Sequence, residues 1–353
     1  MFFHLKRNYW KQFDKNEYDT DIYPIQYIKT GTFKGYPHGW NTSKNTFIDK
    51  TDPNNVSFPS ASKWFNSIVQ SIHCLVVQCH DPGEVIPQEI ISYDIPISMK
   101  ELLESNITKE DLQSGNWIKQ YESREPNPLV FAFFSSLEQQ VTKENLNEIE
   151  DKREAYTDKW VVDLLRCLGC DGWKSRFRVN PSEEYHFLMA GQICRAVLDI
   201  RIDDRMTKLL CWFDESKRLK PIHTPHEHQI KCQRIAETLA FANEIRHASN
   251  GKDIEVFCIG TRHIFVTFGY TKVSNAYLDY VANPGIQEWD DPNASIVHKI
   301  HCSKQESDDI VIKNKKKKFY GYDITDPNDR KFIIESIWHV LGYITKEGIF
   351  RDP

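Results

Sequence analysis

The pattern of apolar and polar positions along this chain is clearest between residues 198 and 217. The run Leu209-Leu210-Cys211-Trp212-Phe213 is uninterrupted, which predicts a buried strand over 209–215. A second strand-like stretch precedes it at 198–204. The run ends at Glu215-Ser216-Lys217, so a carboxylate and an ammonium follow a buried strand directly. Charged side chains are seldom buried unless they are paired or bind a metal, so this triplet is a candidate for chemistry.

Helices are expected on both sides of these two strands. Apolar residues at helical spacing predict a helix over 226–248, and Asn250-Gly251 is a good stop for it. Ser182 is a favoured N-cap and acids follow it, so a helix is expected over 182–196. The predicted order is therefore helix, strand, strand, helix, strand, strand, with the last two strands at 254–259 and 264–268.

Elsewhere the pattern predicts shorter elements and one boundary. Helices are expected at 98–106, 108–115, 157–168 and 327–342, a strand at 130–134, and a helix running into a strand at 61–79. The segment 141–153 is highly charged and is the best candidate for a boundary. We predict an N-terminal region over 1–150 with both helices and strands, a core over 151–281 and an extension over 282–353 with a terminal helix.

Composition narrows the range of functions. The chain has 353 residues, of which 40% are hydrophobic and 27% charged, a balance typical of globular proteins. The net charge of −5 excludes a cationic coat for nucleic acid, so phosphate binding would need a local patch or a bound cation. No apolar run approaches the roughly 20 residues of a membrane span, and no secretory signal is expected at the first residues. Nine scattered cysteines then predict reduced thiols and an intracellular, nuclear or cytoplasmic location without membrane partners.

Strand geometry selects a second acid to accompany Glu215. Opposed residues of an antiparallel pair have a constant sum of residue numbers. Placing Asp199 opposite Glu215 leaves a five-residue connection over 205–209, an acceptable hairpin loop. Placing Asp203 opposite Glu215 would turn the chain inside the apolar run. Asp199 is therefore the favoured partner, and Asp203 and Asp204 are expected near the turn.

Two carboxylates from neighbouring strands suit a hard divalent cation. Asp199 and Glu215 could hold Mg²⁺ or Mn²⁺, which supplies an activated water and stabilises charge on a phosphoryl group. Lys217 could orient that water or stabilise charge. Gln229, Gln233 and Glu237 are spaced four residues apart and share one stripe of the expected helix, where they could position water or phosphates.

The element order, the late Asp199, the Glu-x-Lys strand end and the glutamine-bearing helix together resemble the PD-(D/E)xK nuclease superfamily, which has the restriction-endonuclease-like fold. The stretches 233–239 and 254–261 add to this resemblance, which covers about 180–270 and is similar to nuclease-like domains of Crinkler-type effectors and fungal selfish elements. The resemblance implies an α/β fold with a mixed sheet flanked by helices. It also implies metal-dependent hydrolysis of phosphodiester bonds in DNA, with an alternative in which the fold binds nucleic acid or a protein partner without cleavage. In a third hypothesis the triplet is incidental to a structural protein.

The resemblance also implies roles for particular residues. Asp199 and Glu215 match the metal ligands, Lys217 the catalytic lysine and Gln233 the glutamine of the helix. Glu184 matches the acid of the first helix. Two features depart from the family pattern: Leu198 precedes Asp199 where the family has proline, and one strand is expected before the Glu-x-Lys strand where the family has two.

Weaker signals lie outside this constellation. Cys167-Leu168-Gly169-Cys170 has the spacing of zinc ligands, and His73-Cys74 with Cys79-His80 could supply a second pair, although core cysteines explain the apolar pattern better. The histidines of 223–228 are either ligands or part of a polar loop. The lysine-rich run 313–318 could bind phosphate or direct nuclear import, or could be a solvated loop.

Overall fold

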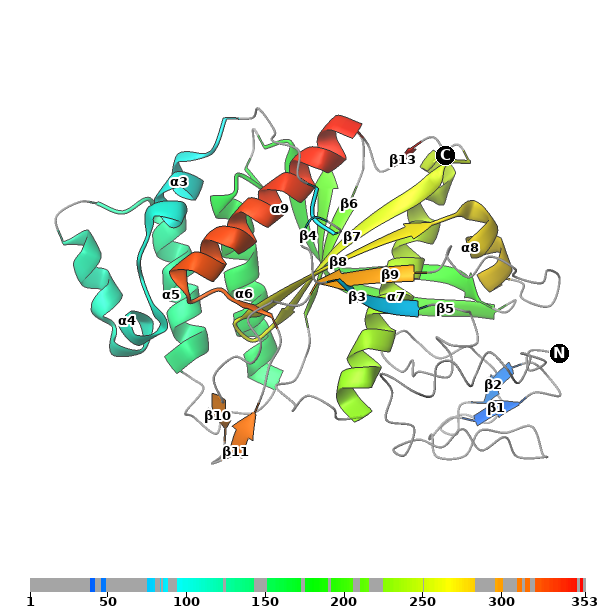
Figure 1. The fold of residues 1–353 in the computed structure, drawn as a ribbon, viewed down its shortest axis with the longest axis horizontal. Coiled ribbons are helices and arrows are strands. Elements are labelled where there is room, and N and C mark those ends of the chain that lie inside the picture. The colour runs from blue at the N-terminus through cyan, green and yellow to red at the C-terminus, as the bar shows by residue number, and fades with distance from the viewer. Residues whose placement is uncertain are drawn as a thin grey trace.

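The computed structural model describes only part of the chain. The described residues are 39–41, 46–48, 75–79, 83, 85–87, 94–122, 125–142, 151–172, 175–189, 192–205, 210–215, 225–249, 251–282, 296–300, 310–312, 315–317, 321–347 and 350–351. Only the backbone is described within 39–41, 46–48, 75–79, 151–154, 181–183, 192, 210–215, 225–232, 248, 296–300, 310–312, 315–317, 346–347 and 350–351. These residues form a mixed α/β structure, which confirms the predicted fold class (Figure 1).

A nine-stranded mixed sheet is the centre of the fold. Its main path runs β3-β9-β8-β7-β6-β5-β4, and β12 and β13 add to β8 and β7. The pairs β3–β9 and β6–β7 are parallel, and the other neighbours are antiparallel. The strands are β3 (Leu75–Cys79), β4 (Phe177–Met189), β5 (Gln192–Asp204), β6 (Leu210–Glu215), β7 (Asp253–Arg262), β8 (Phe265–Val273), β9 (Ile296–Ile300), β12 (Tyr322–Asp323) and β13 (Phe350–Arg351).

The predicted helix over 182–196 is wrong, because this segment lies in β4 and in the first part of β5. Tyr185, Phe187 and Met189 are buried and alternate with exposed neighbours, as strand geometry requires. The same alternation continues along β5. The acids after Ser182 favour a helix start, but apolar residues alternate with polar ones over the following residues, and this alternation is the pattern of a strand.

The extra strand changes the order of elements around the candidate site. Helix α6 (Asp151–Cys167) precedes the meander β4-β5-β6, and helix α7 (Pro225–Ile245) then connects β6 to the parallel strand β7. Two strands therefore precede the strand that carries Asp214 and Glu215. The strand that was missing from the expected order is present.

Helices α7 and α9 (Pro327–Glu347) lie on opposite faces of β7 (Figure 1). Tyr343 of α9 contacts Phe257 and donates a hydrogen bond to Glu255, so the odd-numbered residues of β7 face α9. The guanidinium of Arg234 on α7 lies over Gly260, on the even-numbered face. Because successive strand residues point to opposite faces, these two contacts place α9 on one face of the sheet and α7 on the other.

Helices α3 (Ile97–Glu104), α4 (Lys109–Ser114) and α5 (Pro128–Thr142) share one hydrophobic cluster with α6 and the sheet. The cluster crosses the boundary expected near residue 150. The predicted strand over 130–134 is wrong, because these residues lie within α5. Val130, Phe133, Phe134, Leu137 and Val141 are buried at helical spacing, so one apolar helix face explains the run.

Arg330 joins the start of α9 to the N-terminal helices. Its side chain is fully buried, donates to the carbonyl oxygens of Ser105, Ile324 and Thr325, and lies over the ring of Phe134. Burial lowers the pKa of this guanidinium to about 10, although nearby aspartates oppose the shift. The chain's last long helix is therefore anchored through a buried cation.

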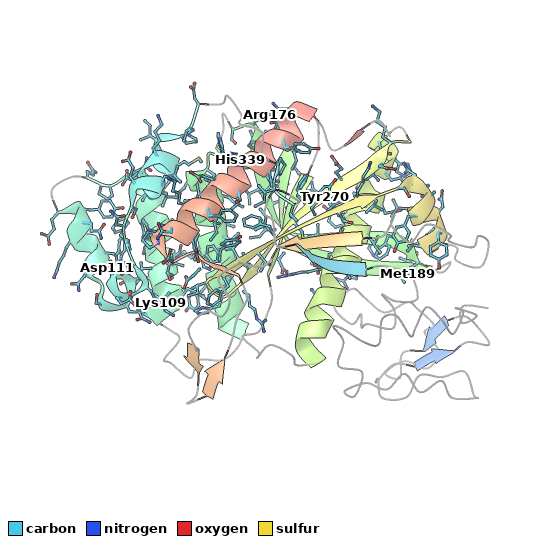
Figure 2. The ribbon with its side chains drawn as sticks, viewed as in Figure 1. Lys109, Asp111, Arg176, Met189, Tyr270 and His339 are labelled. Carbon is cyan, nitrogen blue, oxygen red and sulfur yellow. The ribbon has the colours of Figure 1, made fainter. Side chains whose placement is uncertain are left out.

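Arg176 makes a second polar connection to α9. Arg176 lies beside the C-terminal part of α9 (Figure 2). It donates to Asp204 from Nε to Oδ1 at 3.1 Å and to Oδ2 at 3.0 Å and from Nη2 to Oδ2 at 2.8 Å, and from Nη2 to the carbonyl oxygen of Thr345 at 3.3 Å. Asp204 is almost fully buried. The pair ties the ends of β4 and β5 to the C-terminal part of α9.

The remaining described elements are small. Strand β1 (Gly39–Asn41) pairs with β2 (Thr46–Ile48), β10 (Ile310–Ile312) pairs with β11 (Lys315–Lys317), and helix α8 (Asn275–Ala282) packs against β4. The 3-10 helices η3 (Asn116–Tyr121) and η5 (Arg246–Ser249) follow α4 and α7. None of the helices in the described ranges is both long and apolar enough to cross a membrane.

Candidate functional site

The site begins where the parallel strands β6 and β7 end together. Asp214 is in register with Gly260, and Glu215 with Thr261. The carboxyl ends of neighbouring parallel strands are common places for ligands, because loops and helix ends converge there. The side chains of Asp214 and Glu215, and the whole of Lys217, lie outside what the structure describes.

The observed register between β5 and β6 differs by one residue from the expected register. Ile200 pairs with Phe213, and Asp203 pairs with Leu210. Continued by one step, this register places Asp199 beside Asp214 rather than beside Glu215. The choice of Asp199 over Asp203 still holds, because Asp203 is paired at the start of β6, close to the turn.

Asp199 lies on β5 opposite Ser182 of β4, in a register that is the same on both sides of this position. The pairs between β4 and β5 include Pro181 with Ile200 and Glu183 with Leu198, and they pass over Ser182 and Asp199. Pro181 has no amide hydrogen to donate, which weakens a ladder locally.

The helix-borne glutamine of the prediction lies on α7 as expected. The Gln233 amide donates a hydrogen bond of 2.7 Å to the carboxylate of Glu237. Glu237 is almost fully buried, as are the residues from Ile235 to Ala242 around it. The predicted stripe is therefore real between Gln233 and Glu237, whereas the side chain of Gln229 lies outside the described residues.

Arg234, the next residue of α7, reaches the sheet beside the end of β6. A Cβ atom built on Gly260 would lie 2.3 Å from its guanidinium carbon. Its Nη1 donates to Thr267 Oγ1 at 3.3 Å, and that hydroxyl donates to the Gly260 carbonyl at 3.2 Å. Sequence reasoning missed this arginine, and the one available signal was a glycine inside a strand pattern.

Glu184 does not lie on a helix, so its expected match to the acid of the first helix is wrong. It lies on β4, where its carboxylate accepts from Arg195 at 2.6 Å and lies 3.2 Å from His186. All three side chains are exposed. This arrangement is an ordinary surface ion pair of small energetic value.

The helix that precedes the meander is α6, and it carries acids of its own. Asp158 has one carboxylate oxygen, Oδ1, that is buried and has no hydrogen-bond partner among the described residues. Two residues further along, Trp160 donates to the His263 carbonyl in the turn after β7. This part of α6 therefore lies at the same end of the sheet as Glu215. Buried polar atoms are nearly always paired, so Asp158 Oδ1 is a candidate ligand atom.

Asp203 and Asp204, the rejected acids, both have structural partners. Asp204 is held by Arg176, as described above. Asp203 accepts from Asn180 at 2.6 Å and from Arg201 at 2.5 Å. Arg201 also donates to the hydroxyl of Tyr185 and lies over its ring.

The weaker metal motifs gain no support from the described residues. Cys167 and Cys170 are buried free thiols, and burial raises the pKa of both. Among the described side chains no three His, Cys, Asp or Glu residues gather as metal ligands do. The paired motif at residues 73–80 and the histidines of 223–228 lie outside the described side chains, and Lys315–Lys317 forms β11.

No protein-family model matches this chain, and a comparison with curated proteins gives no match either. The candidate site is therefore defined by its own geometry. It combines the ends of β6 and β7, Asp199 on β5, Asp158 on α6, and Gln233, Arg234 and Glu237 on α7.

Proposed function

We propose that this protein is a PD-(D/E)xK-like nuclease that hydrolyses phosphodiester bonds in DNA with Mg²⁺ or Mn²⁺. The observation that carries the proposal is the order α6-β4-β5-β6-α7-β7, with β6 parallel to β7 and acids on β5 and at the end of β6. Of the two departures from the family pattern, the missing strand is supplied by β4, whereas Leu198 still precedes Asp199. The free thiols of the described cysteines support an intracellular location.

The chemistry of the donor set fits a hard divalent cation. Asp199, the acids Asp214 and Glu215, and Asp158 with its buried oxygen offer the carboxylate oxygens that Mg²⁺ prefers. These acids come from β5, β6 and α6. The end of β6 and the part of α6 that carries Asp158 lie at the same end of the sheet. When bound, such an ion acidifies a water and acts as a Lewis acid toward the phosphoryl group.

Hydrolysis adds water across one P–O bond. The water oxygen bonds to phosphorus, the bond to the leaving oxygen breaks, and that oxygen takes a proton. In this proposal Asp199 holds the cation together with an acid at the end of β6, Asp214 by the observed register or Glu215 by the resemblance. Lys217 orients the water or stabilises charge on phosphorus. Gln233 is oriented by its hydrogen bond to Glu237, and in this proposal it positions the water or a neighbouring phosphate.

The test is nicking of supercoiled plasmid DNA by the full chain with Mg²⁺, with Mn²⁺ and with EDTA. Asp199→Asn, Glu215→Gln and Lys217→Ala are expected to lower the cleavage rate by about a hundredfold or more, because each removes a group that acts on the reacting atoms. Asp158→Asn is expected to weaken cleavage and to raise the metal concentration that gives half-maximal rate.

Glu184→Gln is the matched control, because it removes an acid from an exposed ion pair on β4 and should leave the rate unchanged. Cleavage that persists equally in all variants would show contamination and would refute the proposal. DNA binding without cleavage by the wild type would favour the alternative, a nuclease fold that binds without cutting.

A further inference from the structure

An arginine occupies the space that Gly260 leaves open on the α7 face of the sheet. The guanidinium carbon of Arg234 lies 2.3 Å from the position that a Cβ of residue 260 would take. Any larger residue at 260 would therefore have to displace this guanidinium. The glycine and the arginine form one structural feature, a cation seated in a notch of the strand.

This notch lies one strand away from the end of β6. Gly260 is in register with Asp214, and neighbouring strands are about 4.8 Å apart. By the observed registers Asp199, Asp214 and Gly260 lie on the same face of the sheet, so the guanidinium lies on the face that carries these two acids. Thr267 lies on β8, which flanks β7 on the side away from β6. Its hydroxyl accepts a hydrogen bond from Nη1 of the guanidinium.

The chemistry of the notch suits phosphate. Arginine stays charged, and its planar fork of donors matches phosphate oxygens. The chain as a whole has a net charge of −5, so a nucleic-acid substrate must be attracted by local cations. Arg234 is only partly buried, unlike the residues that follow it on α7.

We infer that Arg234 is a phosphate-binding residue for the DNA backbone beside the scissile bond, and that glycine at 260 is required to admit it. The inference rests on the proposed function for the identity of the ligand. It assigns a role to a side chain next to Gln233 that the sequence pattern did not single out.

The experiment measures DNA affinity by fluorescence anisotropy, with Ca²⁺ in place of Mg²⁺, over a series of salt concentrations. Each phosphate contact contributes about one to the slope of log affinity against log salt. Arg234→Met should lower the affinity by about tenfold or more and reduce this slope by about one, whereas Arg234→Lys should keep most of the slope.

Gly260→Ala is the second variant, because it moves the guanidinium without removing its charge. It should reduce the slope as Arg234→Met does. Arg246→Met is the matched control, since Arg246 pairs with Asn275 and Asp279 away from the notch. It removes the same charge and should leave the slope unchanged.

The outcomes separate this inference from the proposed function. An unchanged slope in Arg234→Met, with lowered thermal stability, would show a structural role and overturn the inference while cleavage by the wild type still stood. A reduced slope without any cleavage would support the inference and refute the nuclease. A wild type that does not bind DNA under any of these conditions would refute both.

Discussion

Two buried charged side chains, Arg330 and Asp204, each connect separate segments of the chain. Arg330 satisfies three backbone carbonyls from two distant segments, and Asp204 is held by the guanidinium of Arg176. Burial of a charge is costly even when the charge has partners, and removal of one partner leaves the other uncompensated. These residues are therefore sensitive positions although they lie outside the candidate site.

Replacement of Arg330 tests this sensitivity. Arg330→Met should lower the free energy of unfolding by about 3–5 kcal/mol, because three buried carbonyl oxygens lose their donor. Arg330→Lys should recover only part of the loss, since an ammonium cannot reach the three acceptors in the same geometry. Urea unfolding followed by circular dichroism measures both.

Arg195→Met is the control, because Arg195 is exposed and pairs only at the surface with Glu184. It should change the free energy of unfolding by less than about 1 kcal/mol. Equal losses in the two methionine variants would contradict the role assigned to Arg330.

The sequence identifies some site residues and misses others for physical reasons. Asp199 is found because an antiparallel hairpin restricts which acids can meet the end of β6. The register is still wrong by one residue, because hairpin connections of several lengths fit between β5 and β6 and the apolar pattern does not distinguish them. Arg234 is missed because its position depends on the absence of a side chain at Gly260, which only the packing reveals.

At the scale of elements, the helix at 182–196 shows where local signals compete. Ser182 and the acids after it favour a helix start, whereas Tyr185, Phe187 and Met189 alternate as in a strand. The strand prevails because β4 and β5 pair over nearly their whole length, and each buries one face. The helices α3, α4, α7 and α9 begin within one residue of their expected starts, because their apolar spacing is helical and some have capping residues. The Thr108 cap, for example, forms a capping box with Asp111. Helix α6 begins at Asp151, inside the segment 141–153 expected as a boundary.

The attachment of α9 to the sheet gives a prediction at this scale. Tyr343 donates to Glu255 Oε2 at 2.9 Å, and Tyr270 donates to Oε1 of the same carboxylate at 2.6 Å. Tyr343→Phe should lower the free energy of unfolding by about 1–3 kcal/mol, because a buried carboxylate loses a donor. In a double-mutant cycle with Glu255→Gln, the two losses should not add. Additive losses would show that the hydrogen bond contributes nothing.

At the scale of the whole molecule, one hydrophobic cluster joins segments far apart in the sequence. Met99, Trp117 and Phe133 from the N-terminal helices belong to the same cluster as Trp160, Ile202 and Ile337. The helices before residue 150 and α9 therefore cover surface that the predicted core, 151–281, would otherwise expose. Large apolar surfaces of this kind are unfavourable in water.

The predicted division at residues 150 and 281 can be tested directly by comparing the fragment 151–281 with the full chain. The fragment lacks α3, α5 and α9, so the apolar face of α6 and the α9 face of β7 would both be exposed. It should aggregate or lose fixed tertiary packing, with a broad unfolding transition, whereas the fragment 94–353 should unfold cooperatively. Heteronuclear NMR and calorimetry distinguish the two states. A well-dispersed spectrum from 151–281 would establish that stretch as an autonomous domain, and the shared cluster would then be an interface between domains rather than one core.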